Sequence, residues 1–136
     1  MMTQKYINDL SYKIIGAAIE VHRHLGPGLL ESVYEECLIF ELREIGLPLK
    51  WQNQVPIIYK GKTLNSKLRY DILVEDLIMV ELKAVELMNP LYKAQLLSYL
   101  KLTEKPKGLL INFNTEVLTR SVIPLVTDVF AALPKE

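Results

Sequence analysis

The sequence predicts an α/β fold in which a mixed β-sheet is flanked by helices. Three observations support this prediction: two consecutive segments have helical spacing, three β-type segments follow them, and a further helix leads to a short apolar strand. Half of the 136 residues are apolar, which suffices for one sizeable core but not for two. We therefore expect a single domain over residues 1–136, with the element order ααβββαβ.

The first two elements are predicted helices separated by a glycine-rich break. From about Asn8 to His24, apolar residues recur every three or four positions. Gly26-Pro27-Gly28 ends this helix, and a second helix runs from about Leu29 to Ile45. Gly46 follows it directly and is a typical C-terminal cap, so the sequence indicates where both helices end.

Three predicted strands occupy the middle of the chain. Val55 to Tyr59 is rich in branched and aromatic residues, and Lys60-Gly61-Lys62 after it is typical of a turn. A second strand runs from about Leu64 to Val74. The tight turn Glu75-Asp76 connects it to a third strand from Leu77 to Val85.

The last part of the chain predicts a helix and a buried strand. Asn89-Pro90 opens the helix, which runs to about Leu102. Gly108 to Phe113 is almost wholly apolar, which indicates a strand covered on both faces. A further strand near Val122 and a short helix near Asp128 complete the predicted elements.

Composition excludes several classes of protein. The 16 basic and 16 acidic residues cancel, whereas a protein that coats nucleic acid through bulk charge would carry a basic excess. Cys37 is the only cysteine, which excludes an internal disulfide and a cysteine-based metal cluster. No segment resembles a signal peptide or reaches the ~20 apolar residues of a membrane span. We expect a soluble, cytoplasmic protein with no membrane partner.

Two carboxylates and a lysine are predicted to meet on neighbouring strands. Side chains alternate along a strand, so Glu81 and Lys83 share one face. Folding the hairpin at Glu75-Asp76 places Asp71 within about one position of Glu81. All three lie in apolar sequence, where a charge is costly unless it is paired or bound to a metal. A hard divalent cation relieves the repulsion between close carboxylates, and a lysine stabilises charge that develops beside it.

A simpler interpretation stays open for each candidate. Glu81 and Lys83 could form an exposed cross-strand ion pair on a half-solvated sheet. Glu31 lies on the apolar stripe of the second helix and could face the sheet, but the helix dipole also favours an acidic residue in a first turn. Gln95 and Tyr99 share one face of the later helix, as the polar residues of an ordinary amphipathic helix do.

The segment Gly28-Leu-Leu-Glu31-Ser-Val-Tyr34 matches the signature of the GxxExxY protein family. Other segments follow in the order of that family: Tyr59-Lys-Gly61, Asp71-Ile-Leu-Val74, Val80-Glu81-Leu-Lys83, Gln95-Leu-Leu-Ser-Tyr99 and Gly108-Leu-Leu-Ile-Asn-Phe113. The likeness extends from about Ile15 to Ile123. The chain thus resembles the GxxExxY family, a branch of the PD-(D/E)XK nuclease superfamily near the RecB and Cas4 type.

This resemblance implies a restriction-endonuclease-like fold with an αβββαβ core. It also implies a metal site, in which Asp71 and Glu81 bind Mg²⁺ or Mn²⁺ and the backbone carbonyl of Leu82 completes the shell. Lys83 corresponds to the lysine that assists hydrolysis in the superfamily. Catalysis and metal binding are therefore expected from one short stretch of two strands.

Further residues are assigned by the same resemblance. Glu31 corresponds to the first-helix glutamate, as a metal ligand or a group that orients water. Gln95 and Tyr99 match the QxxxY motif, which positions substrate or supports the site. Tyr70 stands where the superfamily usually has proline. His22 matches a histidine ligand of RecB-type enzymes, although the helix dipole alone favours a histidine at a helix C-terminus.

The leading hypothesis is a metal-dependent nuclease that hydrolyses phosphodiester bonds of DNA. Basic side chains on the first hairpin and around the later helix would hold the DNA: Lys50, Lys60, Lys62, Lys67, Arg69, Lys93, Lys101, Lys105 and Lys107. Two alternatives stay open. One is a non-catalytic module that keeps the nuclease fold and binds nucleic acid or protein, and the other is a subunit active only in a larger complex. The zero net charge favours these alternatives, and a homodimer or a partner protein stays open as well.

Overall fold

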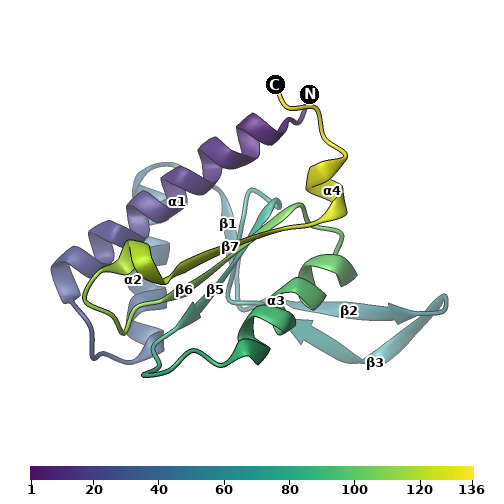
Figure 1. Ribbon diagram of the computed structural model, residues 1–136. Coiled ribbons are helices and arrows are strands. Elements are labelled where there is room, and N and C mark those ends of the chain that lie inside the picture. Colours follow the sequence, from purple (N-terminus) through teal and green to yellow (C-terminus); the bar gives the residue numbers. More distant parts are fainter.

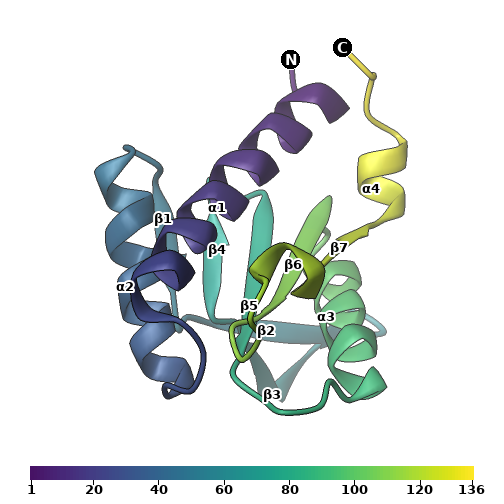
Figure 2. The same ribbon diagram turned by 60° about the vertical axis from the view of Figure 1, so that its left-hand side comes forward.

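A computed structural model describes residues 1–136. A five-stranded mixed sheet forms its centre, with α1 and α2 on one face and α3 on the other (Figure 1, Figure 2). The elements follow one another in this order: α1 Gln4–Leu25, α2 Glu31–Glu44, β1 Leu49–Trp51, β2 Gln54–Tyr59, β3 Lys62–Arg69, β4 Ile72–Val74, β5 Ile78–Lys83, α3 Pro90–Leu102, β6 Lys107–Asn112, η1 Leu118–Ser121, β7 Val122–Val126 and α4 Asp128–Ala131. The predicted α/β class is confirmed.

The main sheet has the strand order β1-β4-β5-β6-β7. β5 and β6 are parallel, while the other neighbouring pairs are antiparallel. A parallel connection needs a crossover, and α3 provides it between β5 and β6. β2 and β3 form a separate two-stranded sheet that extends away from the body of the molecule (Figure 1). We call this hairpin, residues 54–69, the ribbon.

The predicted helices are confirmed, with ends that differ by a few residues. The hydroxyl of Thr3 caps α1 by accepting a hydrogen bond from the backbone of Tyr6. The side chain of Asn89 caps α3 in the same way, and Pro90 occupies its first turn. No helix of the structure combines the length and the apolar character that crossing a membrane requires.

Two apolar clusters hold the layers together. The larger one joins α1 and α2 to the sheet residues Ile72, Val80 and Leu82, among others. The smaller one lies on the opposite face and joins α3 to β4, β5, β6 and β7. At Gly108 a Cβ atom would lie 2.9 Å from the side chain of Leu100, so glycine at this position of β6 lets α3 pack directly on the sheet. The predicted burial of β6 on both faces is confirmed.

The predicted strand from Leu64 to Val74 is wrong as a single element. β3 ends at Arg69 in the ribbon, and β4 starts at Ile72 in the main sheet. Most of β3 is exposed, whereas all three residues of β4 are buried. β3 pairs with β2 in the ribbon, whereas β4 pairs with β1 and β5 in the main sheet, so the two segments belong to different sheets. The strand β1 was not predicted, because three residues at a sheet edge show no periodicity.

Candidate functional site

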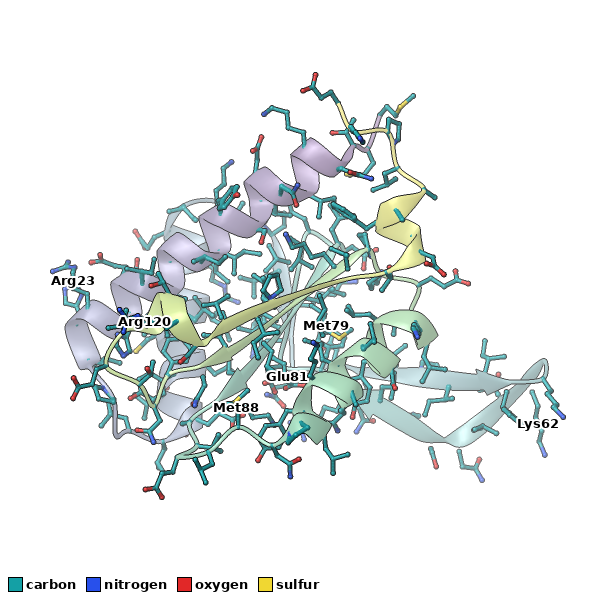
Figure 3. The ribbon with its side chains drawn as sticks, in the orientation of Figure 1. Arg23, Lys62, Met79, Glu81, Met88 and Arg120 are labelled. Carbon is teal, nitrogen blue, oxygen red and sulfur yellow. The ribbon has the colours of Figure 1, made fainter.

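Asp71 and Glu81 lie opposite each other at the end of β4. In the antiparallel pair, Ile72 of β4 faces Val80 of β5, so the preceding Asp71 faces Glu81. Asp71 Oδ2 accepts a hydrogen bond of 2.9 Å from the backbone N–H of Leu82. This bond holds the aspartate against β5 although Asp71 precedes the first residue of β4. The two carboxyl groups therefore share the face of the sheet that α3 covers, where Figure 3 shows Glu81.

The carboxyl group of Glu81 is buried, and the residue is only 8% exposed. Burial raises the pKa of Glu81 to about 9, with a hydrogen bond to the Asp71 carboxyl and its negative charge adding to the effect. The positive charge of Lys83 acts in the opposite direction. Without a cation Glu81 therefore keeps its proton near neutral pH, in the hydrogen bond that it shares with Asp71, because ionising a buried group next to another carboxylate is costly.

Lys83 follows Glu81 on the same face of β5 and is half-buried. Its Nζ lies 4.4 Å from the ring centroid of Tyr92, which is a cation–π contact. Tyr92 is on the first turns of α3, so this helix orients the lysine. The positive charge of Lys83 partly opposes the burial that raises the pKa of Glu31.

α2 contributes two further carboxylates to the site, Glu31 and Glu35. Burial raises the pKa of Glu31 and of Glu35, and the charge of Asp71 raises both further. Gln52, in the loop before the ribbon, donates from Nε2 to both carboxylate oxygens of Glu35 at 2.9 Å. The same Nε2 lies 3.5 Å from Asp71 Oδ1. Gln52 therefore links α2 to the aspartate.

Glu35 and Gln52 were not predicted. The sequence contained a signal for Glu35, because a residue four positions after Glu31 lies on the same face of a helix. It contained none for Gln52, whose loop position and φ of 54° follow from the way the chain turns from β1 into the ribbon.

The segment from Gly28 to Tyr34 has a structural explanation. Gly28 has a φ of 99°, which favours glycine. The fully buried ring of Tyr34 stacks on Phe113 at a centroid distance of 4.6 Å. Its hydroxyl donates to the carbonyl of Gly26 at 2.6 Å and accepts from the N–H of Leu29 at 3.1 Å. Glycine and tyrosine thus fix the loop from which α2 begins, and this start places Glu31.

We expect Tyr34→Phe to destabilise the protein. It removes one hydroxyl and leaves the backbone groups of Gly26 and Leu29 without their partner, which costs about 1–3 kcal/mol. Urea denaturation measures the loss. Tyr12→Phe is the matched control, because Tyr12 is 72% exposed and its hydroxyl makes no hydrogen bond within the chain. Equal stability of the two variants would contradict the anchoring role of Tyr34.

The remaining predicted residues lie at three places. Gln95 is exposed on α3 and donates to the hydroxyl of Tyr99 at 3.0 Å, so the two share one face of the helix as predicted. His22 Nε2 lies 2.6 Å from the carbonyl oxygen of Thr115, which ties α1 to the loop after β6. Lys107 is buried and donates to Asn8, so its predicted place on a phosphate path is wrong.

The oxygen atoms of the site fit a hard divalent cation that takes only part of its ligands from the protein. No group of three or more His, Cys, Asp or Glu side chains is arranged to hold a metal ion. The strand register brings two carboxylate ligands together, Asp71 and Glu81. The N–H and C=O of one residue point to the same side of a strand, so the carbonyl of Leu82 faces the edge where Asp71 lies. Mg²⁺ is typically bound by one or two carboxylates plus waters and substrate phosphates, which agrees with this donor set.

The shared proton predicts how stability changes with pH. Folding raises the pKa of Glu81, so the folded state binds more protons than the unfolded state between about pH 4.5 and about pH 9. The stabilisation is complete below this range and is lost as pH rises through it, by at most about 1.4 kcal/mol per pH unit. Urea denaturation in EDTA at several pH values measures this slope. Glu81→Gln is the control, because it cannot ionise.

A cation that replaces the proton on Glu81 should stabilise the folded protein more as pH rises, opposite to the loss of stability expected without a cation. We expect Mn²⁺ to raise the melting temperature more at pH 8.5 than at pH 6, since binding then displaces fewer protons. Equal pH slopes for the wild type and Glu81→Gln would contradict the shared proton. A Mn²⁺ effect that does not grow with pH would contradict the exchange of proton for cation.

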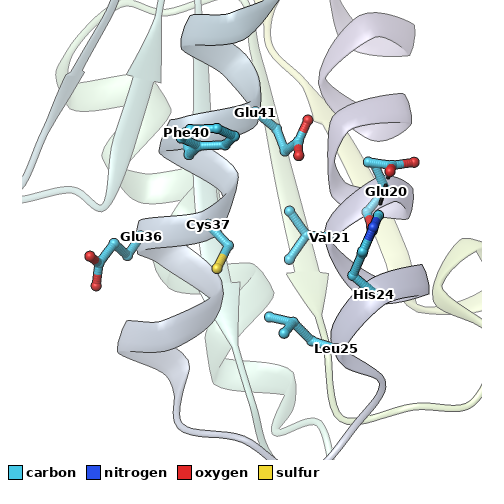
Figure 4. A pocket seen from close by; sticks show the side chains of 8 residues that line it. All are labelled: Glu20, Val21, His24, Leu25, Glu36, Cys37, Phe40 and Glu41. Carbon is cyan, nitrogen blue, oxygen red and sulfur yellow. Dashed lines mark hydrogen bonds and ion pairs between the residues drawn. The ribbon is translucent and has the colours of Figure 1, made fainter.

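The groove between α1 and α2 lies on another part of the molecule (Figure 4). It has a volume of about 360 Å³ and is lined by Glu20, Val21, His24, Leu25, Glu36, Cys37, Phe40 and Glu41. Three glutamates border it, so it would repel a phosphate. None of the predicted site residues lines it.

A mixed sheet with helices on both faces and an Asp–Glu–Lys cluster beside its central strands defines a restriction-endonuclease-like domain. Residues 8–124 match the family described as the PD-(D/E)XK nuclease superfamily. The match covers most of the chain, and the chain therefore belongs to the PD-(D/E)XK nuclease superfamily. Nucleases of this superfamily generally use divalent metals such as Mg²⁺ or Mn²⁺. Comparisons with curated proteins and with solved structures gave no match.

Proposed function

We propose that this protein is a Mg²⁺- or Mn²⁺-dependent nuclease that hydrolyses phosphodiester bonds of DNA. One observation carries the proposal: Asp71 and Glu81 face each other on adjacent strands, with Lys83 next on the same face. Burial makes this acidic pair unfavourable when it is fully ionised, and a cation would relieve that cost. The superfamily supports the same chemistry.

Each residue has a role that its position supports. Asp71, Glu81 and the carbonyl of Leu82 would hold the cation, which when bound polarises a phosphate and lowers the pKa of a bound water. Lys83, oriented by Tyr92, would stabilise the negative charge that develops on the phosphate. Glu31 would orient the attacking water.

The later helix supports the substrate in this proposal. Gln95 is exposed and would contact the nucleic acid, while Tyr99 fixes its side-chain amide through their hydrogen bond. This pair, the segment Gly28–Tyr34 and the order of the remaining motifs support placing the chain in the GxxExxY branch, near the RecB and Cas4 type.

The test begins with calorimetry of Mn²⁺ and Mg²⁺ binding to the purified protein. Labelled single-stranded, duplex and branched DNA are then incubated with the protein and each cation. The proposal expects binding of one cation and cleavage that EDTA stops. Cation binding without cleavage of any substrate by the isolated chain would contradict a self-sufficient nuclease. Absence of cation binding would contradict the site.

A module that binds DNA without cleaving it is the second candidate. The proton shared by Asp71 and Glu81 favours it, because such a pair is stable without a cation. DNA binding that neither Mg²⁺ nor Mn²⁺ changes, with no turnover, would support this candidate. Activity that appears only on addition of a co-purified protein would indicate a subunit of a larger complex.

A further inference from the structure

Positive charge is concentrated in one part of this neutral chain. Residues 45–70 contain no acidic residue and five basic ones: Lys50, Lys60, Lys62, Lys67 and Arg69. All 16 acidic residues lie elsewhere, together with the other 11 basic residues. The net charge of zero therefore conceals one strongly basic segment, and four of its five charges lie on the ribbon.

The ribbon presents these charges to solvent. β2 and β3 pair only with each other, and the hairpin extends beyond the body of the molecule, with Lys62 at its far end (Figure 3). Lys60, Lys62, Lys67 and Arg69 are all exposed. None of them forms an ion pair with a carboxylate of the chain. Unpaired, exposed charges of one sign on a projecting element are suited to a polyanion.

The two faces of the ribbon differ. Cross-strand pairing places Arg69 beside Gln54 and Lys67 beside Pro56, on one exposed face. The opposite face carries Val55 and Leu68, and Val55 packs against the cluster under α3. The apolar face therefore anchors the root of the ribbon, the end that joins the main body of the molecule, and the basic face stays exposed to solvent.

The basic face begins at the candidate site. Arg69 is the last residue of β3, lies on the exposed face and is two residues before Asp71. Lys67 continues this face outward, and Lys60 and Lys62 add positive charge at the far end of the hairpin, where Lys62 pairs with Tyr59 on the other face. A phosphate backbone that runs from this end past Lys67 and Arg69 would lead to Asp71 and Glu81.

We propose that the ribbon is the element that binds duplex DNA, with its basic face along the phosphates and its root delivering one strand to the site. The choice of ligand rests on the proposed function. The dimensions support a duplex: a two-stranded ribbon fits the major groove, which is ~12 Å wide. The six residues of β2 extend about 20 Å, enough to reach the phosphates on either side of that groove.

The experiment measures DNA binding without turnover. The triple variant Lys60→Gln/Lys62→Gln/Lys67→Gln removes three ribbon charges and leaves Arg69, which lies near the site. The control Lys5→Gln/Lys13→Gln/Lys135→Gln removes three exposed charges, two on α1 and one next to the C-terminal residue. Both α1 and the C-terminus lie away from the ribbon (Figure 1). Circular dichroism checks that both variants fold. Fluorescence anisotropy with a short labelled duplex in EDTA gives the affinities at several salt concentrations.

The ribbon variant is expected to bind duplex DNA at least about tenfold more weakly at low salt, with a log–log salt slope smaller by about 2 to 3. The control should bind within about twofold of the wild type. Four results would overturn the proposal: no DNA binding by the wild type, an unchanged salt slope, equal losses in both variants, or ribbon-dependent binding that prefers single strands. Labelled polyglutamate that binds as tightly as DNA would overturn it too, in favour of an acidic protein.

This assay separates the two proposals, because EDTA removes the divalent cations that cleavage would need. If DNA binding depends on the ribbon but the protein cleaves no DNA with either cation, the proposed nuclease activity is overturned and the proposed role of the ribbon is retained. If the protein cleaves DNA but its affinity for DNA does not depend on the ribbon, the proposed role of the ribbon is overturned and the proposed nuclease activity is retained.

Discussion

Asp71→Asn is expected to abolish both cation binding and DNA cleavage. The substitution keeps an oxygen that can accept the hydrogen bond from Leu82, so β4 and β5 should remain aligned. It removes one of the two charges that attract a cation. Loss of the cation's charge stabilisation, several kcal/mol, lowers the cleavage rate by about 10³-fold or more. Calorimetry with Mn²⁺ and a cleavage assay measure the two effects.

Asp76→Asn is the matched control for this variant. Asp76 lies in the turn of the same hairpin, is exposed, and pairs with Lys105 at 3.0 Å. Asparagine tolerates the left-handed backbone of this turn, so its variant should fold, bind Mn²⁺ and cleave as the wild type does. Undiminished cation binding by Asp71→Asn would show that the ion lies elsewhere and would refute the assigned ligands.

Lys83→Ala is expected to separate cation binding from cleavage. Lys83 stands beside the carboxylates and is not a ligand, since its ammonium group can only donate. The variant should bind Mn²⁺ at least as tightly as the wild type, because a neighbouring positive charge has been removed. Cleavage should fall by about 10²–10³-fold, the loss typical of removing one group that stabilises transition-state charge. Single-turnover kinetics at saturating protein measures this loss.

Lys93→Ala is the control for Lys83→Ala. Lys93 is exposed on α3 next to Tyr92, and its removal changes the same net charge without touching the carboxylates. A comparable loss in both lysine variants would indicate weakened DNA binding and not a role in the reaction. Full activity of Lys83→Ala would contradict a role of Lys83 in the reaction.

The core of the candidate site could be predicted because it is local. Asp71 and Glu81 are joined by one hairpin, and a predicted turn at Glu75-Asp76 brings Asp71 within about one position of Glu81. The turn has three residues, Glu75 to Leu77, between the paired Val74 and Ile78, and this length sets Asp71 opposite Glu81. Alternation along β5 then places Lys83 on the same face. The helices and the buried strand β6 were likewise predicted from spacing and caps, to within a few residues.

The contacts that complete the site could not be predicted in the same way. Gln52 contacts both Glu35 of α2 and Asp71 from the loop between β1 and β2, and no local sequence pattern encodes these contacts between distant segments. Tyr92 meets Lys83 only through the packing of α3 on β6. Lys107 was expected at the surface, yet it is buried beside Asn8 of α1.

Spacing along the chain was sufficient to predict the α/β class, the hairpin and the acidic pair, because each depends on residues a few positions apart. Packing between distant segments decided the rest. It divided the predicted strand from Leu64 to Val74 between two sheets and brought the start of α2 to Asp71. It also gave Glu81 its burial, and therefore its pKa, because the dielectric environment of a side chain depends on what covers it and not on its neighbours in sequence.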